Sequence, residues 1–104
     1  MNKSLTIHPL SIVCKDAELS GAISIGEGTV IHPKCNIESS LQSGGIEIGK
    51  YNIIEEGVQI VNYSKNKLII GDYNRFRSGA IIQCKQIGND NLVKQKGFSK
   101  NSLY

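Results

Sequence analysis

Residues 23–37 read ISIGEGTVIHPKCNI, and through this stretch an aliphatic residue returns at every sixth position: Leu19, Ile25, Ile31 and Ile37. A six-residue period fits neither the 3.6-residue repeat of an amphipathic helix nor the two-residue alternation of a half-buried strand. It is typical of a hexapeptide β-helix, in which three short strands make one triangular coil. This stretch therefore predicts a β-helix.

The six-residue register extends over about residues 7–98 and is interrupted twice. Residues 38–47, ESSLQSGGIE, are rich in serine and glycine, and residues 61–69, VNYSKNKLI, also break the period. We expect both segments to be loops. Both follow the third strand of a coil, so they should emerge at the same corner, one above the other. Insertions gathered on one face of a solenoid often form a binding surface.

Equivalent positions of successive coils carry similar residues. The inward position of the first strand is isoleucine in each of five coils, and that of the second strand is aliphatic or phenylalanine. The chain has no tryptophan and only 6% aromatic residues, so isoleucine has to fill the interior. The predicted structural core contains Ile7, Ile25, Ile31, Ile48, Ile54, Ile70, Phe76 and Ile87.

Two further sets of equivalent positions, which we call columns because they stack along the axis, belong to the corner after the first strand. Directly after the isoleucine, four coils carry glycine, which predicts a corner with positive φ or with close backbone packing. These corner glycines are Gly26, Gly49, Gly71 and Gly88. Four positions after the isoleucine stand small or amide side chains, which can hydrogen-bond along the axis when stacked in register. These are Ser11, Thr29, Asn52, Asn74 and Asn91.

Length and composition indicate the broad class. A chain of 104 residues is expected to form one domain, residues 1–104, with an irregular tail at 99–104. It has no apolar run long enough for a transmembrane helix. The start, MNKSLTIHPL, lacks the apolar region of a signal peptide. Three cysteines without CxxC spacing suggest free thiols in a reducing compartment, so we expect a cytoplasmic protein.

Charge is spread unevenly along the chain. Residues 1–64 carry four lysines and seven acidic residues, a net −3, whereas residues 65–104 carry eight basic and two acidic residues, a net +6. A solvated surface is sufficient to explain this distribution of charge. The alternative hypothesis is that the basic end of the chain binds an acidic partner. We expect no nucleic-acid partner, because no recognised motif and no basic stretch interleaved with aromatics is present.

Two histidines, His8 and His32, are the first candidates for chemistry, and each stands in an Ile-His-Pro tripeptide. Hexapeptide acyltransferases use a histidine base, and γ-class carbonic anhydrases bind a metal through three histidines. Two histidines 24 residues apart lie on different faces of the coil and cannot supply three ligands. We read them as corner residues before a proline turn.

The corner column Cys14, His32 and Glu55 contains residue types that bind zinc. The column continues into Arg77 and Lys94, and no paired zinc-finger spacing exists, so we expect a turn column with an exposed Glu55–Arg77 ion pair. The motifs GxSxG and HExxH, a Walker loop and GxGxxG after a strand are missing. We therefore assign no catalytic, cofactor-binding or metal-binding residue, and expect no cofactor.

Four runs of the sequence resemble the dynactin subunit 6 family: SGAISIGEGTVIHPKCNI, IEIGKYNIIEEGVQIVN, LIIGDYNRFRSGA and IGNDNLV. The resemblance covers about residues 7–98, and its most specific pieces are Thr29–Pro33 and Asn52–Glu56. It implies an all-β, single-stranded, left-handed parallel β-helix. Family members continue with further coils and a C-terminal helix packed along the β-helix. The pattern here stops near Phe98, so we expect about five coils and no capping helix.

The resemblance also implies a function. It points to a non-enzymatic scaffold subunit of the dynactin pointed-end complex, which supports cargo binding by dynein–dynactin and transport along microtubules. The implied partners are dynactin subunit 5, the pointed-end actin-related protein and subunit 4, without direct membrane insertion. The implied location is the cytoplasm and its cytoskeleton. A hexapeptide-family enzyme, either an acyltransferase or a γ-type carbonic anhydrase, remains the alternative.

Overall fold

The structure, a computed structural model, describes residues 5–40, 42–83 and 86–94. In this part of the chain every regular element is a β-strand, and no helix is present. The strands are β1 (Leu5–Ile7), β2 (Ile12–Val13), β3 (Glu18–Ser20), β4 (Ile23–Ile25), β5 (Val30–Ile31), β6 (Asn36–Ser39), β7 (Ile46–Ile48), β8 (Ile53–Ile54), β9 (Gln59–Asn62), β10 (Leu68–Ile70), β11 (Arg75–Phe76), β12 (Ile81–Ile82), β13 (Gln86–Ile87) and β14 (Leu92–Val93).

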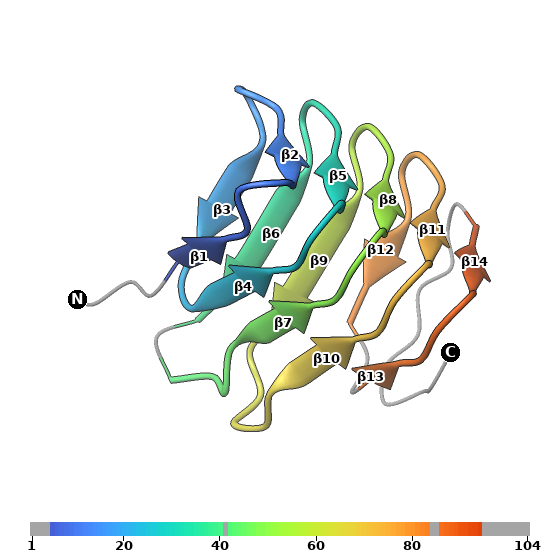
Figure 1. The fold of residues 1–104 in the computed structure, drawn as a ribbon. Coiled ribbons are helices and arrows are strands. Elements are labelled where there is room, and N and C mark those ends of the chain that lie inside the picture. Colours follow the sequence, from blue (N-terminus) through green and yellow to red (C-terminus); the bar gives the residue numbers. More distant parts are fainter. Residues whose placement is uncertain (1–4, 41, 84–85, 95–104) are drawn as a thin grey trace.

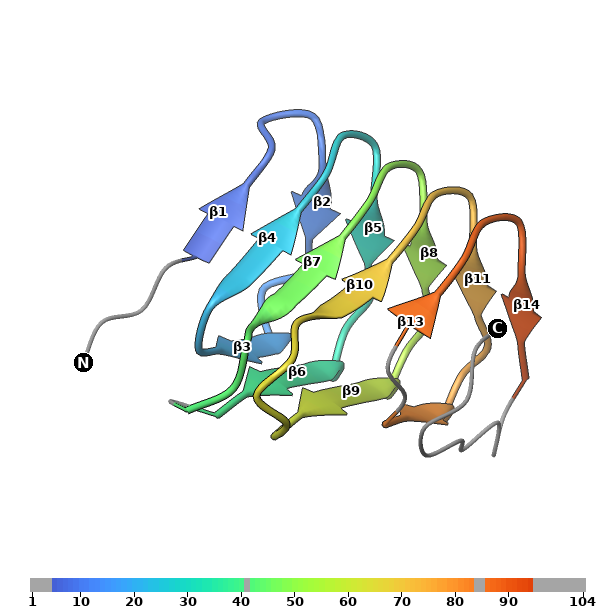
Figure 2. The same ribbon diagram turned by 90° about the horizontal axis from the view of Figure 1, so that it is seen from below.

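These strands stack into three parallel sheets that form the walls of a β-solenoid (Figure 1). The first sheet has the order β1-β4-β7-β10-β13, the second β2-β5-β8-β11-β14, and the third β3-β6-β9-β12. Seen from below, in Figure 2, each turn of the chain contributes one strand to each wall before it rises to the next turn. The β-helix prediction is therefore confirmed.

The described residues make four complete turns, and β13 and β14 begin a fifth. Phe98 and the tail at 99–104 lie outside the described residues. The left-handed sense of winding stays a prediction from the resemblance. The described part of the chain contains no helix with the length and apolarity that a membrane span requires.

Alternation within each strand explains why the core is continuous. In β7, Ile46 and Ile48 are buried while Glu47 between them is exposed, as a two-residue side-chain period requires. Stacking then places each inward residue directly on the next, for example Ile25 on Ile48. Seven of the eight predicted core residues are at most 2% exposed: Ile25, Ile31, Ile48, Ile54, Ile70, Phe76 and Ile87.

Ile7, the eighth predicted core residue, departs from this pattern. Its side chain is 38% exposed. It lies in β1, which is the outermost strand of its sheet and pairs on one side only, with β4. Because no described strand covers the other side of β1, the inward direction alone does not bury Ile7.

The corner glycines are needed for close packing rather than for positive φ. A Cβ built on Gly26 would lie 2.7 Å from the carbonyl oxygen of Gly49, and one on Gly49 would lie 2.6 Å from that of Gly71. Real Cβ atoms do not come this close, so a side chain would push the turns apart. Of the two alternatives predicted for this corner, close backbone packing is therefore the one found at Gly26, Gly49 and Gly71, which are not among the left-handed residues.

Positive φ occurs two residues later in the same corner. Equivalent positions of successive turns are left-handed there, whether or not the residue is glycine. They are Gly28 (φ 71°), Tyr51 (φ 54°), Tyr73 (φ 61°) and Asp90 (φ 58°). Three of these four residues carry a side chain in a region where a non-glycine residue costs roughly 1 kcal/mol or more.

The predicted polar column forms a hydrogen-bonded ladder along the axis, which confirms the expectation for its buried members. Asn52 Nδ2 donates to Gly71 O (2.8 Å), and Asn52 Oδ1 accepts from Asn74 N (2.9 Å). Asn74 repeats both bonds one turn on, to Gly88 O (2.8 Å) and from Asn91 N (2.8 Å). Each side chain therefore ties its own turn to the next.

The two interruptions meet at one corner, as predicted. Gly44 N donates to Ser64 O (3.0 Å), and Asn62 Nδ2 donates to Gly45 O (2.8 Å) and Asn66 O (2.9 Å). Their bounds are narrower than predicted, because β6 continues to Ser39 and β9 to Asn62 before the chain leaves the sheet. The connections span residues 40–45 and 63–67.

Candidate functional site

The two histidines occupy different corners of the solenoid. His8 follows β1 in the first sheet, and its Nδ1 accepts a hydrogen bond from Leu10 N (3.0 Å), which closes the local turn. His32 follows β5 in the second sheet and donates its backbone N–H to Ile54 O (2.9 Å). The structure therefore does not bring the two side chains into one site.

Cys14, His32 and Glu55 do lie in one column, because β2, β5 and β8 pair in register. Within the described residues, however, no group of three histidine, cysteine or acidic side chains is placed to hold a metal ion. The buried thiol of Cys35 lies just inside this corner and contacts the Glu55 carbonyl oxygen (3.0 Å). Burial raises the pKa of the Cys35 thiol, which favours the neutral form.

Glu55 is the centre of the most connected polar cluster on this corner. Its Oε2 accepts from Arg75 Nε (2.8 Å), and its Oε1 accepts from Ser78 N (3.0 Å) and lies 3.5 Å from Arg77 Nε. The hydrogen bond from Arg75 is the largest cause that lowers the pKa of the Glu55 carboxyl. Glu55 is therefore held as a carboxylate, and the predicted Glu55–Arg77 ion pair is confirmed.

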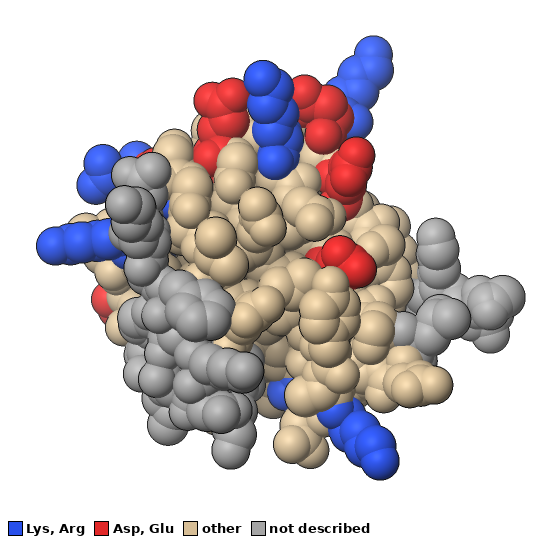
Figure 3. Space-filling model, turned by 180° about the vertical axis from the view of Figure 1, so that it is seen from behind, with Lys and Arg blue, Asp and Glu red and all other residues tan. Residues whose placement is uncertain are grey.

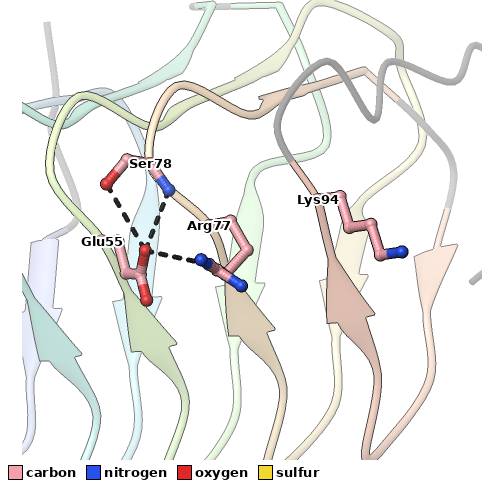
Figure 4. A pocket seen from close by; sticks show the side chains of 4 residues that line it. All are labelled: Glu55, Arg77, Ser78 and Lys94. Carbon is pink, nitrogen blue, oxygen red and sulfur yellow. Dashed lines mark hydrogen bonds and ion pairs between the residues drawn. The ribbon is translucent and has the colours of Figure 1, made fainter.

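A cavity of about 300 Å³ opens beside this cluster and is lined by Glu55, Arg77, Ser78 and Lys94. In Figure 4, Ser78 and Arg77 both turn toward the Glu55 carboxylate, whereas the Lys94 side chain extends from the next strand without a contact to these residues. The Ser78 hydroxyl also donates to Glu55 Oε1 (3.4 Å), so the recess combines one carboxylate with the basic side chains of Arg77 and Lys94.

Charged side chains gather along the edge that contains this recess. Seen from behind, in Figure 3, acidic and basic side chains crowd the top edge, which in Figure 1 carries the turns after β2, β5, β8 and β11. The broad face below that edge carries few charges. The charged members of these turns are Lys15, Asp16, Lys34, Glu55, Glu56 and Arg77, and Lys94 follows β14 at the equivalent position of the next turn.

A second surface feature is an aromatic pair on the corner after the first sheet. Tyr51 and Tyr73 stack with ring centroids 5.4 Å apart and planes 15° apart. Tyr51 Oη donates to Glu27 Oε2 (3.1 Å), and this hydrogen bond is the largest cause that raises the pKa of Tyr51. The residues Tyr51 and Tyr73 are 43% and 59% exposed, so the stacked pair lies on the surface.

Sequence reasoning missed Arg75 and the tyrosine pair. Arg75 is registered with Ile53, two residues before Glu55 on the neighbouring strand, and only its outward direction brings it to the carboxylate. Tyr51 and Tyr73 each stand three positions after a core isoleucine, Ile48 and Ile70. A reading of that column would have found the pair.

No protein-family model matches the chain. It is 48% identical to dynactin subunit 6 of Dictyostelium discoideum over 83% of its own length and 46% of that protein. It is 35% identical to dynactin subunit 6 of Danio rerio and 35% identical to that of Nematostella vectensis, over 90% of the chain in each case. These alignments cover 53% and 56% of the two relatives.

The chain thus spans about half the length of the relatives it matches. The alignment with the Dictyostelium protein covers 86 residues of the chain. Over most of its length, this chain is a homologue of dynactin subunit 6.

Proposed function

We propose that the chain is a non-enzymatic structural subunit of dynactin. The observation that supports this most is the identity of 34–48% with dynactin subunit 6 from five organisms, over at least 83% of the chain. The solenoid suits such a role, because its flat walls and its stacked loops offer extended surfaces to neighbours. The chain acts as one domain in this role.

In this proposal the chain sits in the pointed-end complex, beside dynactin subunit 5, the pointed-end actin-related protein and subunit 4. There it supports cargo binding by dynein–dynactin and microtubule-based transport. Its location is the cytoplasm, in association with the cytoskeleton. The homology supports membership in dynactin, and the finer placement follows from the family resemblance.

Affinity purification of the tagged full chain from its own cells, followed by mass spectrometry, tests the proposal. We expect co-purification of the pointed-end subunits, with subunit 5 the most abundant. An Ile48→Asp variant is the matched loss-of-fold control, because it places a carboxylate at a position that is 1% exposed. Recovery of the chain without any dynactin subunit would contradict the proposal.

The alternative of a hexapeptide-family enzyme makes a different prediction. An acyltransferase or a γ-type carbonic anhydrase would need a histidine base or three metal-binding histidines, and His8 and His32 stand on separate corners. We expect no CO₂ hydration and no acyl transfer by the purified protein, and no change on His32→Ala. A stoichiometric zinc that is lost in the His32→Ala variant would favour the enzyme instead.

A further inference from the structure

We propose that the recess beside Glu55 binds an oxyanion, a carboxylate or a phosphate, carried by an acidic segment of a partner protein. The binding groups are the guanidinium of Arg77 and the ammonium of Lys94, which line the recess. Arg75 lies beside the recess on the other carboxylate oxygen of Glu55, and Ser78 donates both its backbone N–H and its hydroxyl to Glu55 Oε1. This goes beyond membership in dynactin and does not depend on it, because it rests on this chain's own geometry.

The two arginines are held in place by Glu55 and keep donors to spare. The ion pairs use the Nε atom of each guanidinium, at 2.8 Å for Arg75 and 3.5 Å for Arg77. A guanidinium has five N–H donors, so each arginine retains its terminal NH₂ groups for a further acceptor. The arginine side chains are 57% and 54% exposed, whereas that of Glu55 is 18% exposed. Glu55 is therefore the less exposed partner and orients the two guanidinium groups.

The charge balance of the recess favours an anion. Two basic side chains, Arg77 and Lys94, and one acidic side chain, Glu55, line the recess. Arg75 beside it and the exposed Glu56 on the same turn add one positive and one negative charge, so the balance stays at one positive charge. Lys94 forms no ion pair with any described residue. An incoming oxyanion would neutralise the charge of Lys94 and accept hydrogen bonds from the terminal NH₂ groups of arginine. The planar guanidinium matches the geometry of carboxylate and phosphate oxygens.

Apolar residues beside the recess indicate that the anion is attached to a protein segment. Arg75 is registered between Ile53 and Leu92 on the outward face of the second sheet, and Leu92 is 51% exposed. A peptide with an apolar side chain next to its acidic residue could cover Leu92 while its oxyanion enters the recess. A free inorganic anion would leave Leu92 exposed.

Fluorescence anisotropy on the purified 104-residue chain tests this. The probes are labelled nine-residue peptides on one leucine-containing frame, with glutamate, phosphoserine or serine at the central position, and inorganic phosphate serves as a competitor. We expect the glutamate and phosphoserine peptides to bind and the serine peptide not to bind. Lys94→Gln should weaken the anionic peptides about tenfold, or 1.4 kcal/mol. Raised salt should weaken binding further.

Lys34→Gln is the matched control, because Lys34 is exposed on the equivalent turn of an earlier coil and lies outside the recess. It removes the same charge and should leave peptide binding nearly unchanged. The double variant Arg77→Glu/Lys94→Glu should reject the acidic peptides and accept one with lysine at the central position.

Equal binding of the serine and glutamate peptides would overturn the proposal, and so would equal losses in Lys94→Gln and Lys34→Gln. Inorganic phosphate that binds as tightly as the peptides would overturn the assignment to a protein segment, as would tighter binding of nucleic acid or anionic vesicles. These measurements need no dynactin, so their failure is distinguishable from a failure of the proposed function.

Discussion

The ring of Tyr51 lies directly over the α-carbon of Gly28, so closely that a Cβ on Gly28 would come within 2.3 Å of two ring carbons. Gly28 also has φ 71°, which disfavours a side chain for a second reason. We predict that Gly28→Ala destabilises the protein by roughly 2–4 kcal/mol, because backbone strain and displacement of the Tyr51 ring combine. Denaturant unfolding measures the cost.

Gly57 is the matched control for this variant. It has φ 74°, yet a Cβ there would meet nothing within 4 Å. Gly57→Ala should therefore cost only the strain of the left-handed backbone, about 1–2 kcal/mol. In the double variant Gly28→Ala/Tyr51→Ala the clash is absent, and the added cost of Gly28→Ala should fall to that of Gly57→Ala. Equal costs for Gly28→Ala and Gly57→Ala in the wild-type background would show that the ring contact is unimportant.

Neighbouring residues of β10 test the inward register. Ile70 is 1% exposed and Ile69 is 42% exposed. Ile70→Ala should cost about 2–5 kcal/mol through lost burial and the cavity left behind. Ile69→Ala should cost less than about 1 kcal/mol, because its side chain is already partly in water. Urea unfolding of both variants distinguishes the faces, and a larger loss for Ile69→Ala would mean that the register is shifted by one residue.

The amide ladder gives a prediction about polar groups inside the solenoid. Asn74 is 1% exposed, and its side chain donates to Gly88 O and accepts from Asn91 N. Asn74→Val removes both bonds and should cost roughly 2–4 kcal/mol, because the backbone groups are left without partners.

Asn74→Thr has nearly the same shape as the valine variant but retains a hydroxyl. In the same column, Thr29 Oγ1 donates to Gly49 O (2.7 Å) and accepts from Asn52 N (3.3 Å), so a threonine can fill both roles. We expect the threonine variant to be clearly more stable than the valine variant in chemical unfolding. If the two melt together, the ladder contributes no net stability.

The cluster at Glu55 predicts a dependence of stability on pH. The folded state lowers the pKa of Glu55 below its ordinary value of 4.5, first through the Arg75 hydrogen bond. A lowered folded pKa means that this contribution is present above pH 4.5 and is lost as the pH falls through the folded pKa. Wild-type thermal stability should therefore drop more steeply below pH 4.5 than that of Glu55→Gln. Parallel melting curves for the two proteins would refute this.

The inward residues could be predicted because the repeat itself specifies them. Stacked turns require the same kind of side chain at Ile25, Ile48 and Ile70, so one period identifies the whole core. The ladder through Asn52 and Asn74 follows for the same reason, since each side chain repeats its neighbour's bonds.

The outward residues could not be predicted in this way. Solvent imposes no period on them, so the approach of Arg75 to Glu55 depends on a side-chain direction that the repeat does not specify. The tyrosine pair is different, because Tyr51 and Tyr73 occupy equivalent positions of successive turns. The corner glycines show a related limit, because composition cannot separate close packing, found at Gly26, from positive φ, found at Gly28.

Sedimentation of the tagged chain from cell extract through a sucrose gradient tests the central claim, that this solenoid is built into dynactin. We predict that the wild-type chain and an Ile69→Asp variant, changed at an exposed position, migrate with the large dynactin complex. The Ile48→Asp variant, changed in the buried core, should be absent from those fractions. A folded wild-type chain that sediments only as a small free particle, apart from every dynactin subunit, would contradict the account.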